Sequence, residues 1–542
     1  MSKKKITKLA YQTIKLINQP GYYKYLKALN SVETIQRRKL KKLLSLSKHN
    51  PYFKKYKLEP KMSWEQFNNN ASITEYSDWH EIITSQKKSG RNILNSSKCQ
   101  RYQPTSGSTD TMKWIPYSNL FLSELNNAIS PLAVDLLKKN KKLMAGQQYW
   151  SLSWIPTDLR KEITNKIIDD TKLLPQWKQM ALSLTMAVPN EVSYAKTSES
   201  SMMATIAYLT SAKDLTFISV WSPTFALTLF EQMKLYKSDL IEILSLGNWG
   251  RWQKNLSFLP PPKSLRTASI LNRWDGTIDS DFFISLWPNL AMVSSWDTST
   301  SKYWAHDLKK LLPQATFQGK GLWATEAVVT IPFENQYPLA VTSHFYEFLD
   351  LQDNKIYPAW NLKKTQIVSP LLTTGSGFFR YKLNDKLKVV DFLHDCPCFE
   401  FMGRNGDIDM VGEKMSPEIA MLIIDKISKQ FQVRVINLMA VLPEKNNLKK
   451  PYYLLLCEGD NTTNISPTIA EQTEKFLCKS FHYNLARDQK LLEHTKVYLK
   501  NNAMEVYQKH SEKKNIILGN TKIEPLTICH ENKLPINSPN NY

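Results

Sequence analysis

The alternation of hydrophobic and polar positions predicts strands followed by amphipathic helices along much of the chain. The clearest case is residues 214–235, where LTFISVW carries the β-branched and aromatic side chains typical of a strand. Ser222 then suits the N-cap of a helix and Pro223 its first position, and the apolar residues that follow recur at helical spacing. This order of strand and helix favours an α/β fold built in layers.

A second amphipathic pattern predicts a helix over residues 30–48. Asn30 and Glu33 stand in the arrangement of a capping box, in which each side chain satisfies a free backbone N–H of the first turn. Pro51 lies just past the expected end, where a proline stops a helix.

The last third of the chain has a regular order of its own, which predicts a small α+β domain. We expect helix, strand, strand, helix, strand and helix over residues 416–431, 433–442, 452–459, 466 onward, 496–499 and 502–513. The preceding segment GRNGDIDMVG is rich in Gly and Asp and lacks periodicity, as a hinge does. The prediction is therefore a large N-terminal domain (1–402), a hinge (403–412) and a small C-terminal domain (413–542).

Composition supports a folded chain that does not span a membrane. Of the 542 residues, 42% are hydrophobic and 11% aromatic, which favours a packed core over disorder. No apolar run approaches the ~18 residues of a membrane span, and the basic N-terminus lacks the apolar stretch of a secretory signal. The six cysteines form no C-x-x-C pair, so we expect reduced thiols and a cytoplasmic location.

The charge balance is strongly basic, with a formal net charge of +22. Such a surface attracts polyanions, so a non-catalytic RNA-binding protein is one alternative. The lysines are spread along the whole chain, however, and their densest runs are short. We therefore expect no dedicated nucleic-acid function.

The first motif with chemical content is TSGSTDTMK at residues 105–113. Its hydroxyls and backbone N–H groups are the donors that phosphate oxygens accept from, and a lysine ends the segment. It is not a Walker A loop, because G-x-x-x-x-G-K is absent. Taken alone, the segment is equally typical of a polar surface turn.

The second motif is FQGKGLWATEAVVTIP at residues 317–332. Gly319 and Gly321 allow a close approach of the backbone to a flat ligand. Thr325 and Glu326 place a hydroxyl and a carboxylate before an apolar run, and a carboxylate there could hold Mg²⁺. The alternative is a strand end with a solvated glutamate.

The third motif is GFFRYKLNDKLKVVDF at residues 377–392, in which KVV predicts a strand. We expect Asn384 and Asp385 to lie in the turn before it. Asp385 could accept two hydrogen bonds from a ribose diol, although an aspartate in a turn often makes only a local hydrogen bond.

The order of these motifs resembles the acyl-adenylate-forming superfamily that includes firefly luciferase. More closely, the chain is similar to the auxin-responsive promoter family of acyl acid amido synthetases. The matching segments span most of the chain from about residue 30. They are WSPTF (221–225), LWPNL (286–290), KGLWATEAVVTIP (320–332), HFYEF (344–348), RYKLND (380–385), FMGR (401–404), GEK (412–414) and LGNTKIEPL (518–526).

The resemblance implies an ATP site. The residues expected to bind ATP are Thr105, Ser106, Gly107, Ser108, Thr109 and Lys113 at the phosphates, Gly319, Lys320, Gly321, Leu322 and Trp323 at the adenine, Asp385 at the ribose, and Arg404 near the hinge. Two positions depart from the family pattern, because Asp110 and Asn384 stand where relatives carry glycine.

The resemblance also implies three catalytic residues. Thr325 is expected to contact the α-phosphate, Glu326 to bind Mg²⁺, and Lys522 to reach the forming adenylate. Rotation about the hinge would bring Lys522 in for adenylation. The base that deprotonates the amine is not identified, and His344 is more typical of a structural histidine.

The implied activity is a ligase that uses ATP and Mg²⁺. It adenylates a small carboxylic acid, releasing pyrophosphate, and transfers the acyl group to an amino acid or other amine, releasing AMP. A thioester-forming ligase that makes an acyl-CoA through the same adenylate is the alternative within enzymes. The acid, the amine and the oligomeric state are not determined by the sequence.

Overall fold

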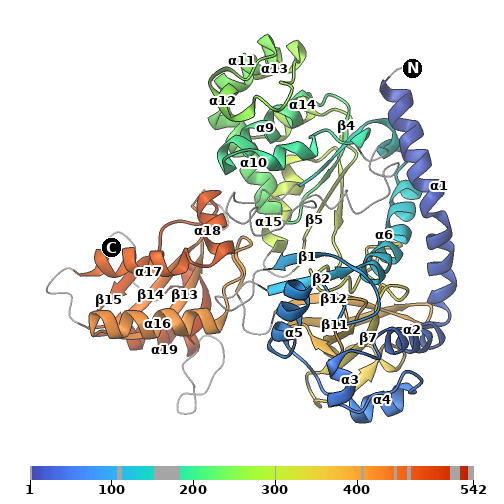
Figure 1. The fold of residues 1–542 in the computed structure, drawn as a ribbon. Coiled ribbons are helices and arrows are strands. Elements are labelled where there is room, and N and C mark those ends of the chain that lie inside the picture. Colours follow the sequence, from blue (N-terminus) through green and yellow to red (C-terminus); the bar gives the residue numbers. More distant parts are fainter. Residues whose placement is uncertain are drawn as a thin grey trace. The chain divides into compact units, whose positions relative to one another are not determined.

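The computed structural model describes residues 3–105, 113–151, 183–298, 301–404, 408–444, 449–459, 465–512 and 525–534 (Figure 1). The chain divides into two compact units. Unit 1 comprises residues 1–104 and 114–403, and unit 2 comprises residues 404–542 with the short segment 105–113. Among the described helices, none is long and apolar enough to cross a membrane.

A parallel four-stranded sheet forms one part of unit 1. Its strands are β3 (Gln147–Trp150), β4 (Leu215–Ser219), β5 (Met292–Ser295) and β6 (Thr316–Gly319). They lie in the order β3-β4-β5-β6, and each neighbouring pair is parallel. Because all four strands run in one direction, their carboxyl ends meet at a single edge.

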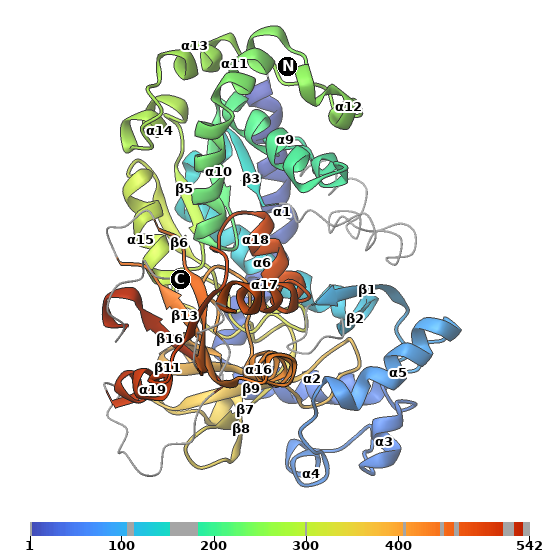
Figure 2. The same ribbon diagram turned by 90° about the vertical axis from the view of Figure 1, so that its left-hand side faces the viewer.

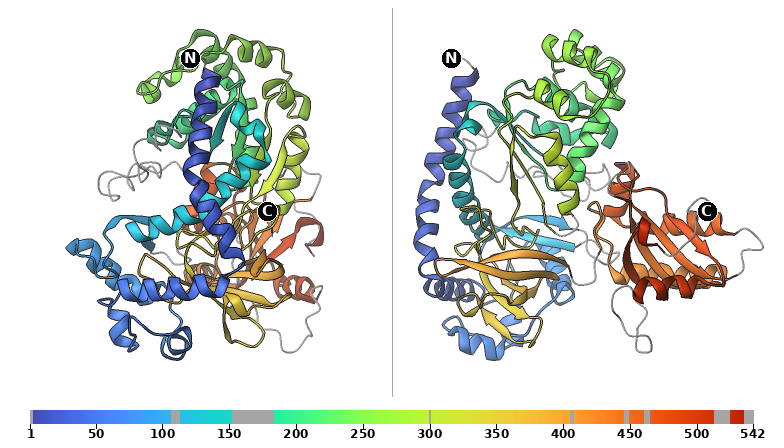
Figure 3. Two further views of the ribbon diagram at one scale, coloured as in Figure 1. Left: turned by 90° about the vertical axis from the view of Figure 1, so that its right-hand side faces the viewer. Right: turned by 180° about the vertical axis from the view of Figure 1, so that it is seen from behind.

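Helices cover both faces of this sheet. Ile218 and Val293 pack on one face with residues of α9 (Ser198–Ser211) and α10 (Pro223–Leu235). Figure 2 shows these two helices beside the strands of the sheet. Phe217 and Met292 point to the other face and pack with residues of α1 (Lys3–Leu29) and α6 (Asn119–Lys139). These two long helices run side by side (Figures 1 and 3). The prediction of a layered α/β domain is confirmed.

An antiparallel sheet forms the other part of unit 1. Its strand order is β12-β11-β9-β7-β8, and β10 also pairs with β9. The strands are β7 (Phe345–Asp350), β8 (Ile356–Pro358), β9 (Ile367–Thr373), β10 (Tyr381–Lys382), β11 (Asp385–Leu393) and β12 (Cys396–Arg404). A separate two-stranded sheet pairs β1 (Cys99–Thr105) with β2 (Lys113–Ser118).

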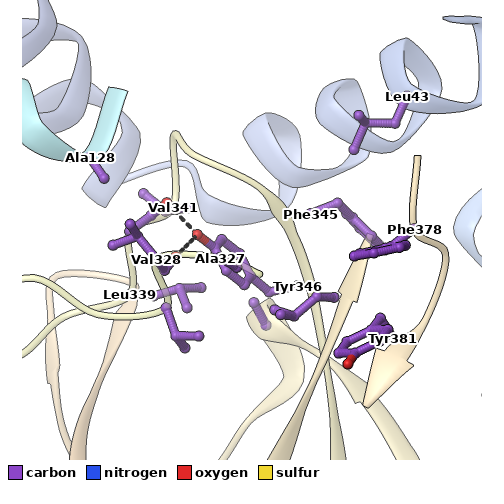
Figure 4. Close-up of a cluster of buried hydrophobic side chains, with 14 of the residues drawn as sticks. Leu43, Ala128, Ala327, Val328, Leu339, Val341, Phe345, Tyr346, Phe378 and Tyr381 are labelled. Carbon is purple, nitrogen blue, oxygen red and sulfur yellow. Dashed lines mark hydrogen bonds between the residues drawn. The ribbon is translucent and has the colours of Figure 1, made fainter. Parts of the chain in front are cut away.

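The hydrophobic core at the antiparallel sheet contains Phe345, Phe378 and Tyr381, together with Leu43 of α2 (Val32–Leu46), as Figure 4 shows. Buried residues of the connection between β6 and β7 belong to the same core. The hydroxyl of Tyr346 donates to the carbonyl oxygens of Val328 at 2.5 Å and Ala340 at 3.2 Å. The connection is thereby anchored to β7, which fixes the backbone that carries the second sequence motif.

The start of α2 differs from the sequence prediction. The helix begins at Val32, its N-cap is Ser31 rather than Asn30, and Ser31 makes no side-chain capping hydrogen bond. The expected capping box is therefore wrong. Pro51 does follow the helix, and it is the first residue of α3 (Pro51–Lys55), whose N-cap Asn50 accepts a hydrogen bond from the backbone of Tyr52.

The other described helices of unit 1 pack around its sheets. They are α4 (Trp64–Asn70), α5 (Tyr76–Ser89), α11 (Lys237–Leu246), α12 (Gln253–Leu256), α13 (Leu265–Arg273), α14 (Ser280–Leu286) and α15 (Ser301–Leu311). Short 3₁₀ segments connect several of these elements.

Unit 2 is an α+β structure with a mixed sheet in the order β15-β14-β13-β16. Strands β13 and β14 are antiparallel, whereas β16 and β15 add to them in parallel. The elements are α16 (Pro417–Phe431), β13 (Arg434–Leu442), β14 (Tyr452–Glu458), α17 (Ser466–Leu477), α18 (Phe481–Asp488), β15 (Lys496–Leu499), α19 (Ala503–Glu512) and β16 (Leu526–His530). All six predicted elements are present, while α18 and β16 were not predicted.

Gly403 and Arg404 of the expected hinge are the last two residues of β12, and residues 408–412 are held by hydrogen bonds within unit 2. The carboxylate of Glu413 accepts from the backbone N–H groups of Met410 at 2.9 Å and Val411 at 2.8 Å, and from the Tyr453 hydroxyl at 2.6 Å. Burial raises the pKa of Glu413 to about 7. Residues 408–412 therefore form a fixed turn, and the hinge assignment at 403–412 stays a prediction.

Candidate functional site

Aromatic side chains gather where the parallel strands end. Trp150 is the last residue of β3, Trp221 lies two residues after β4, and Trp296 follows β5 directly. Lys320 follows β6, and Trp323 lies within 6.4 Å of Trp221, measured between ring centroids. We call these five residues the tryptophan–lysine cluster. The carboxyl edge of a parallel sheet is where ligands of α/β proteins usually bind.

Backbone hydrogen bonds hold the central tryptophan of the cluster in place. The carbonyl of Trp221 accepts from the backbone N–H of Trp296 at 2.9 Å and from the Ser295 hydroxyl at 3.1 Å. The rings of Trp221 and Trp296 lie 5.9 Å apart. The ends of β4 and β5 are thus joined beyond the last residues of the sheet.

Lys320 places its ammonium group among these rings. Its Nζ donates to the Ser219 hydroxyl at 2.8 Å, and it lies 4.8 Å from the centroid of Trp221 and 5.9 Å from that of Trp150. Burial lowers the pKa of Lys320 to about 7, and no charged group contributes to this change. This pKa lies well below the ordinary range for lysine.

Gly319 and Gly321 are required by packing within the protein. A Cβ atom on Gly319 would lie 2.1 Å from the Tyr337 hydroxyl and 2.2 Å from Oδ1 of Asp297. On Gly321 it would lie 2.2 Å from the Thr330 carbonyl oxygen. The sequence prediction attributed the glycines to a flat ligand, and the structure shows that neighbouring protein atoms already exclude a side chain at both positions.

Thr325 and Glu326 occupy the two central positions of a tight turn. Ala324 and Ala327 exchange backbone hydrogen bonds of 2.9 and 3.3 Å across it, and Trp323 pairs with Val328 in an antiparallel bridge. The carbonyl of Thr325 accepts a hydrogen bond of 3.1 Å from the Tyr117 hydroxyl. The turn therefore presents a hydroxyl and a carboxylate at the tip of a short, fixed hairpin.

The carboxylate of Glu326 has phenol groups beside it. The Tyr381 hydroxyl donates to Oε1 at 3.5 Å, and the carboxylate raises the pKa of Tyr381, which burial already raises. Over the described residues, no group of three or more His, Cys, Asp or Glu side chains could hold a metal ion. A single partly exposed carboxylate still fits Mg²⁺, which binds one or two carboxylates together with substrate phosphates.

Asp385 is the first residue of β11 and is only 2% exposed. The expectation that it lies in a turn is therefore wrong, because the strand begins three residues before KVV. A buried aspartate at a strand end is held more firmly than one in a loop. Its replacement by alanine would disturb packing as well as any ligand contact, so Asn is the better substitution.

Two other polar residues in the matching segments are structural. Arg380 is buried and forms a two-pronged ion pair with Glu347, with N–O distances of 2.9 and 2.6 Å. His344 is also buried. Its Nε2 accepts from the backbone N–H of Val328 at 3.3 Å, so Nδ1 carries the proton and donates to Glu124 at 2.8 Å. Both ring nitrogens are used inside the protein, which leaves neither for substrate.

Several predicted site residues are not placed by the structure. Ser106, Gly107, Ser108, Thr109, Asp110 and Lys522 lie outside the described residues, as do the side chains of Thr105 and Arg404. Lys113 is described and begins β2. Their roles at ATP stay predictions.

The sequence analysis predicted Trp323 as a functional residue but missed Trp150, Trp221 and Trp296. Trp221 lies in the WSPTF segment, which carries a match to the family but no predicted role. The available signal was a tryptophan at or just after the end of a short apolar segment, as in QQYW and MVSSW. That signal gains meaning only when the strands are known to be parallel neighbours.

Comparison with known proteins agrees with this architecture. The GH3 family N-terminal domain matches residues 22–317, and the GH3 family central domain matches residues 337–404. The chain is similar to the solved structure of AtGH3.15 acyl acid amido synthetase in complex with 2,4-DB, with a TM-score of 0.60 at 16% identity over 94% of each chain. It is similar to a second structure of GH3.15 acyl acid amido synthetase, with a TM-score of 0.59 at 15% identity over 94% of each chain.

A search of curated proteins finds no match. At 15–16% identity the structural likeness establishes the fold, which has a large N-terminal domain and a smaller C-terminal domain. The family is established separately, because the GH3 N-terminal domain alone matches more than half of the chain. The resemblance inferred from the sequence motifs is confirmed, and the chain belongs to the GH3 family.

Proposed function

We propose that the protein is an ATP-dependent acyl acid amido synthetase. The observation that carries this proposal is the Thr325–Glu326 turn, which presents a hydroxyl and a carboxylate on the connection leaving the carboxyl edge of the parallel sheet. Membership of the GH3 family and likeness to solved acyl acid amido synthetases support it.

The chemistry explains why ATP is needed. A carboxylate and an amine do not condense in water, because the carboxylate has no leaving group. In the first half-reaction the carboxylate oxygen attacks the α-phosphorus of ATP, and the bond to pyrophosphate breaks. In the second, an uncharged amine attacks the acyl carbon, AMP leaves with the former carboxylate oxygen, and the amine loses a proton. The protein contributes mainly by positioning the reactants and stabilising charge.

The residues of the turn have separate proposed roles. The Thr325 hydroxyl donates to an oxygen of the α-phosphate. Glu326 holds Mg²⁺, which when bound offsets the negative charge of the phosphates. Asp385 accepts hydrogen bonds from the ribose hydroxyls, and the backbone of 319–323 lines the adenine. The phosphate segment 105–113 and Arg404 complete the proposed ATP site.

Lys522 is proposed to act only in the first half-reaction. Its ammonium would stabilise the charge that accumulates as pyrophosphate leaves, and acyl transfer from a finished adenylate has no such demand. Lys522→Ala should therefore slow adenylation by ~10²–10³-fold and leave amide formation from synthetic acyl-AMP near the wild-type rate. Equal slowing of both steps would contradict the assignment, and with it the proposed rotation about residues 403–412.

The function is tested by ATP–pyrophosphate exchange over a panel of carboxylic acids, in the absence of CoA. An acid that supports exchange is then incubated with pooled amino acids and amines, and the products are identified by mass spectrometry. An amide product with release of AMP supports the proposal. Exchange followed by a CoA-dependent product identifies a thioester-forming ligase instead, and RNA retention that is lost at high salt, without any exchange, identifies a binding protein.

A further inference from the structure

The long N-terminal helix α1 carries three exposed apolar side chains on a single line. Leu9, Leu16 and Tyr23 are 55%, 70% and 49% exposed. They are spaced by seven residues, which is close to two turns of an α-helix, so their side chains point in the same direction. We call these three residues the apolar line. Single exposed apolar side chains are ordinary on a protein surface, whereas an ordered group of them is typical of a surface that meets another molecule.

The opposite face of α1 is packed inside unit 1. Tyr11 is buried with Leu143 of the 3₁₀ segment η1 (Lys141–Ala145). Asn18 is also buried, and its side chain accepts a hydrogen bond of 2.9 Å from the Ser130 hydroxyl of α6. The helix is thereby fixed along α6 (Figure 3), and the apolar line lies on the face that unit 1 leaves exposed.

The charge of α1 is entirely positive. Its 27 residues include seven lysines and neither aspartate nor glutamate. Lys5 stands four residues before the apolar line and Lys27 four residues after it, so both continue the line at its ends. By helical spacing, Lys8 and Lys24 lie on its two sides. All four of these lysines are exposed, so ammonium groups surround the apolar line.

Elements beside α1 extend the positive surface. The Nζ of Lys138, near the end of α6, lies 3.9 Å from the ring centroid of Tyr22 in α1. Lys141 and Lys142 are exposed in η1, which packs against α1. The two carboxylates of α6 are both buried. The surface along α1 therefore combines apolar side chains with cations from two further elements.

This combination fits an anionic lipid surface better than other polyanionic or protein partners. A basic helix face with exposed leucines lies in the plane of a membrane, where the apolar side chains enter the boundary of head groups and acyl chains. RNA also attracts lysines, but its phosphate backbone offers no apolar interior to the leucines. In a symmetric dimer the same face would meet itself, and the lysines of one copy would repel those of the other.

We propose that the apolar line of α1 and the lysines around it dock the protein on membranes that contain anionic phospholipids. The helix lies parallel to the membrane surface, with Leu9, Leu16 and Tyr23 in the boundary region. The lysines meet the lipid phosphates, and their methylene stems cover part of the same boundary. This surface is distinct from the carboxyl edge of the parallel sheet, so the inference does not depend on the proposed activity.

Binding is measured by sedimentation of the full chain with two kinds of vesicle. One is phosphatidylcholine alone, and the other contains phosphatidylcholine and phosphatidylglycerol in equal amounts. We expect the chain to bind the anionic vesicles more tightly by at least ~10-fold. This binding should weaken as the salt concentration rises, because salt screens the attraction between lysines and phosphates.

Matched leucine variants test the apolar part of the surface. Leu9→Gln combined with Leu16→Gln should weaken binding to the anionic vesicles by ~10- to 100-fold, because two apolar side chains no longer leave water. Leu9→Phe combined with Leu16→Phe keeps these positions apolar and should bind as the wild type does. The control is Leu235→Gln with Leu246→Gln, at the ends of α10 and α11, where the leucines are 59% and 60% exposed.

Matched lysine variants test the charged part. Lys8→Gln combined with Lys27→Gln should weaken binding to the anionic vesicles by ~10- to 30-fold. Lys309→Gln with Lys310→Gln is the control, because both lysines are exposed on α15. Circular dichroism checks that each variant is folded, which we expect because every substituted side chain is exposed.

Four results would overturn the inference. The first is equal binding, or no binding, to the two kinds of vesicle. The second is a Leu9→Gln, Leu16→Gln variant that binds anionic vesicles as the wild type does. Charge alone would then attract polyanions, and filter retention of RNA by the same variant would identify a nucleic-acid surface. The third is a dimer in light scattering that this variant loses, which would assign the apolar line to a contact between two copies. The fourth is a control variant that weakens binding as much as its matched variant in α1.

Discussion

Replacing Lys320 by methionine should make the protein more stable, although it removes a hydrogen bond. Methionine has nearly the length of the lysine side chain and no charge to desolvate. The lysine ammonium is surrounded by Ser219 and two tryptophans, and burial lowers its pKa from 10.5 to about 7. Folding therefore destabilises the charged form of Lys320. Replacing the ammonium by an uncharged side chain removes this cost in free energy.

The magnitude follows from the pKa change. At ~1.4 kcal/mol for each pKa unit, the buried charge destabilises the fold by at most ~5 kcal/mol. The side chain remains partly exposed, and relaxation with water penetration reduces such penalties. Loss of the hydrogen bond to Ser219 subtracts about 1 kcal/mol. We expect Lys320→Met to raise the free energy of unfolding by about 1–3 kcal/mol at pH 6.

The stability advantage of Lys320→Met over the wild type should decrease as the pH rises. Below pH 7 the folded and unfolded chains both carry the lysine proton, so the wild type bears the whole penalty. Between pH 7 and the ordinary lysine pKa the folded chain releases this proton while the unfolded chain keeps it, so wild-type stability rises with pH. The advantage of Lys320→Met should therefore be largest at pH 6 and should disappear toward pH 10.

Urea unfolding followed by circular dichroism at pH 6, 7.5 and 9 measures this difference. The other titrating groups are the same in the wild type and in Lys320→Met. The difference between their free energies of unfolding at each pH therefore reports the contribution of Lys320. Lys309→Met is the control, because Lys309 is exposed, and its effect should be small and independent of pH. A Lys320→Met variant that is less stable than the wild type at pH 6, or whose advantage does not change with pH, would refute the reasoning.

Three further changes test other parts of the structure. Gly319→Ala places a Cβ 2.1 Å from the Tyr337 hydroxyl and 2.2 Å from Oδ1 of Asp297. Urea unfolding should show that the free energy of unfolding falls by ~1–3 kcal/mol. Unchanged stability would contradict the close packing at this position. Glu326→Gln should raise the Mg²⁺ concentration that gives half-maximal pyrophosphate exchange, because an amide is a poorer ligand for Mg²⁺, and an unchanged requirement would make Glu326 structural. Burial raises the pKa of Glu413 from 4.5 to about 7. As the pH rises from 4.5 to 7, the unfolded chain loses this proton while the folded chain keeps it. The free energy of unfolding of the wild type should therefore fall by ~1–3 kcal/mol over this range. Glu413→Gln should remove that decline in thermal unfolding curves, and a decline that persists would show that another group causes it.

Local signals in the sequence were sufficient to predict most elements of unit 2. Pro417 at the start of α16 and the apolar run of β13 both act through backbone preferences of neighbouring residues. Strand β16 could not be predicted in this way. Its sequence LTICH is short, and it forms a strand through parallel pairing with β13. That pairing joins residues about ninety positions apart, which no local pattern reveals.

The candidate site shows the same division between local and distant information. The Thr325–Glu326 turn was found because its residues are adjacent in the sequence and match a family motif. Asp385 was misplaced because β11 begins at Asp385, before the apolar residues that predicted the strand, and its pairing with β9 already includes Leu387. Of the tryptophan–lysine cluster, only Lys320 and Trp323 were predicted as site residues. The other members lie at the ends of separate strands, which only the sheet order β3-β4-β5-β6 brings together.

The central claim is that the chain activates a carboxylic acid as an acyl-adenylate before it forms an amide. Oxygen labelling tests this most directly. The acid that supports pyrophosphate exchange is prepared with ¹⁸O in both carboxylate oxygens and is incubated with ATP, Mg²⁺, the amine and the full chain, and the nucleotide product is analysed by mass spectrometry. The account predicts that each turnover yields AMP carrying one ¹⁸O atom and an amide carrying the other. Amide formed with unlabelled AMP, or with ADP and labelled phosphate, would contradict it.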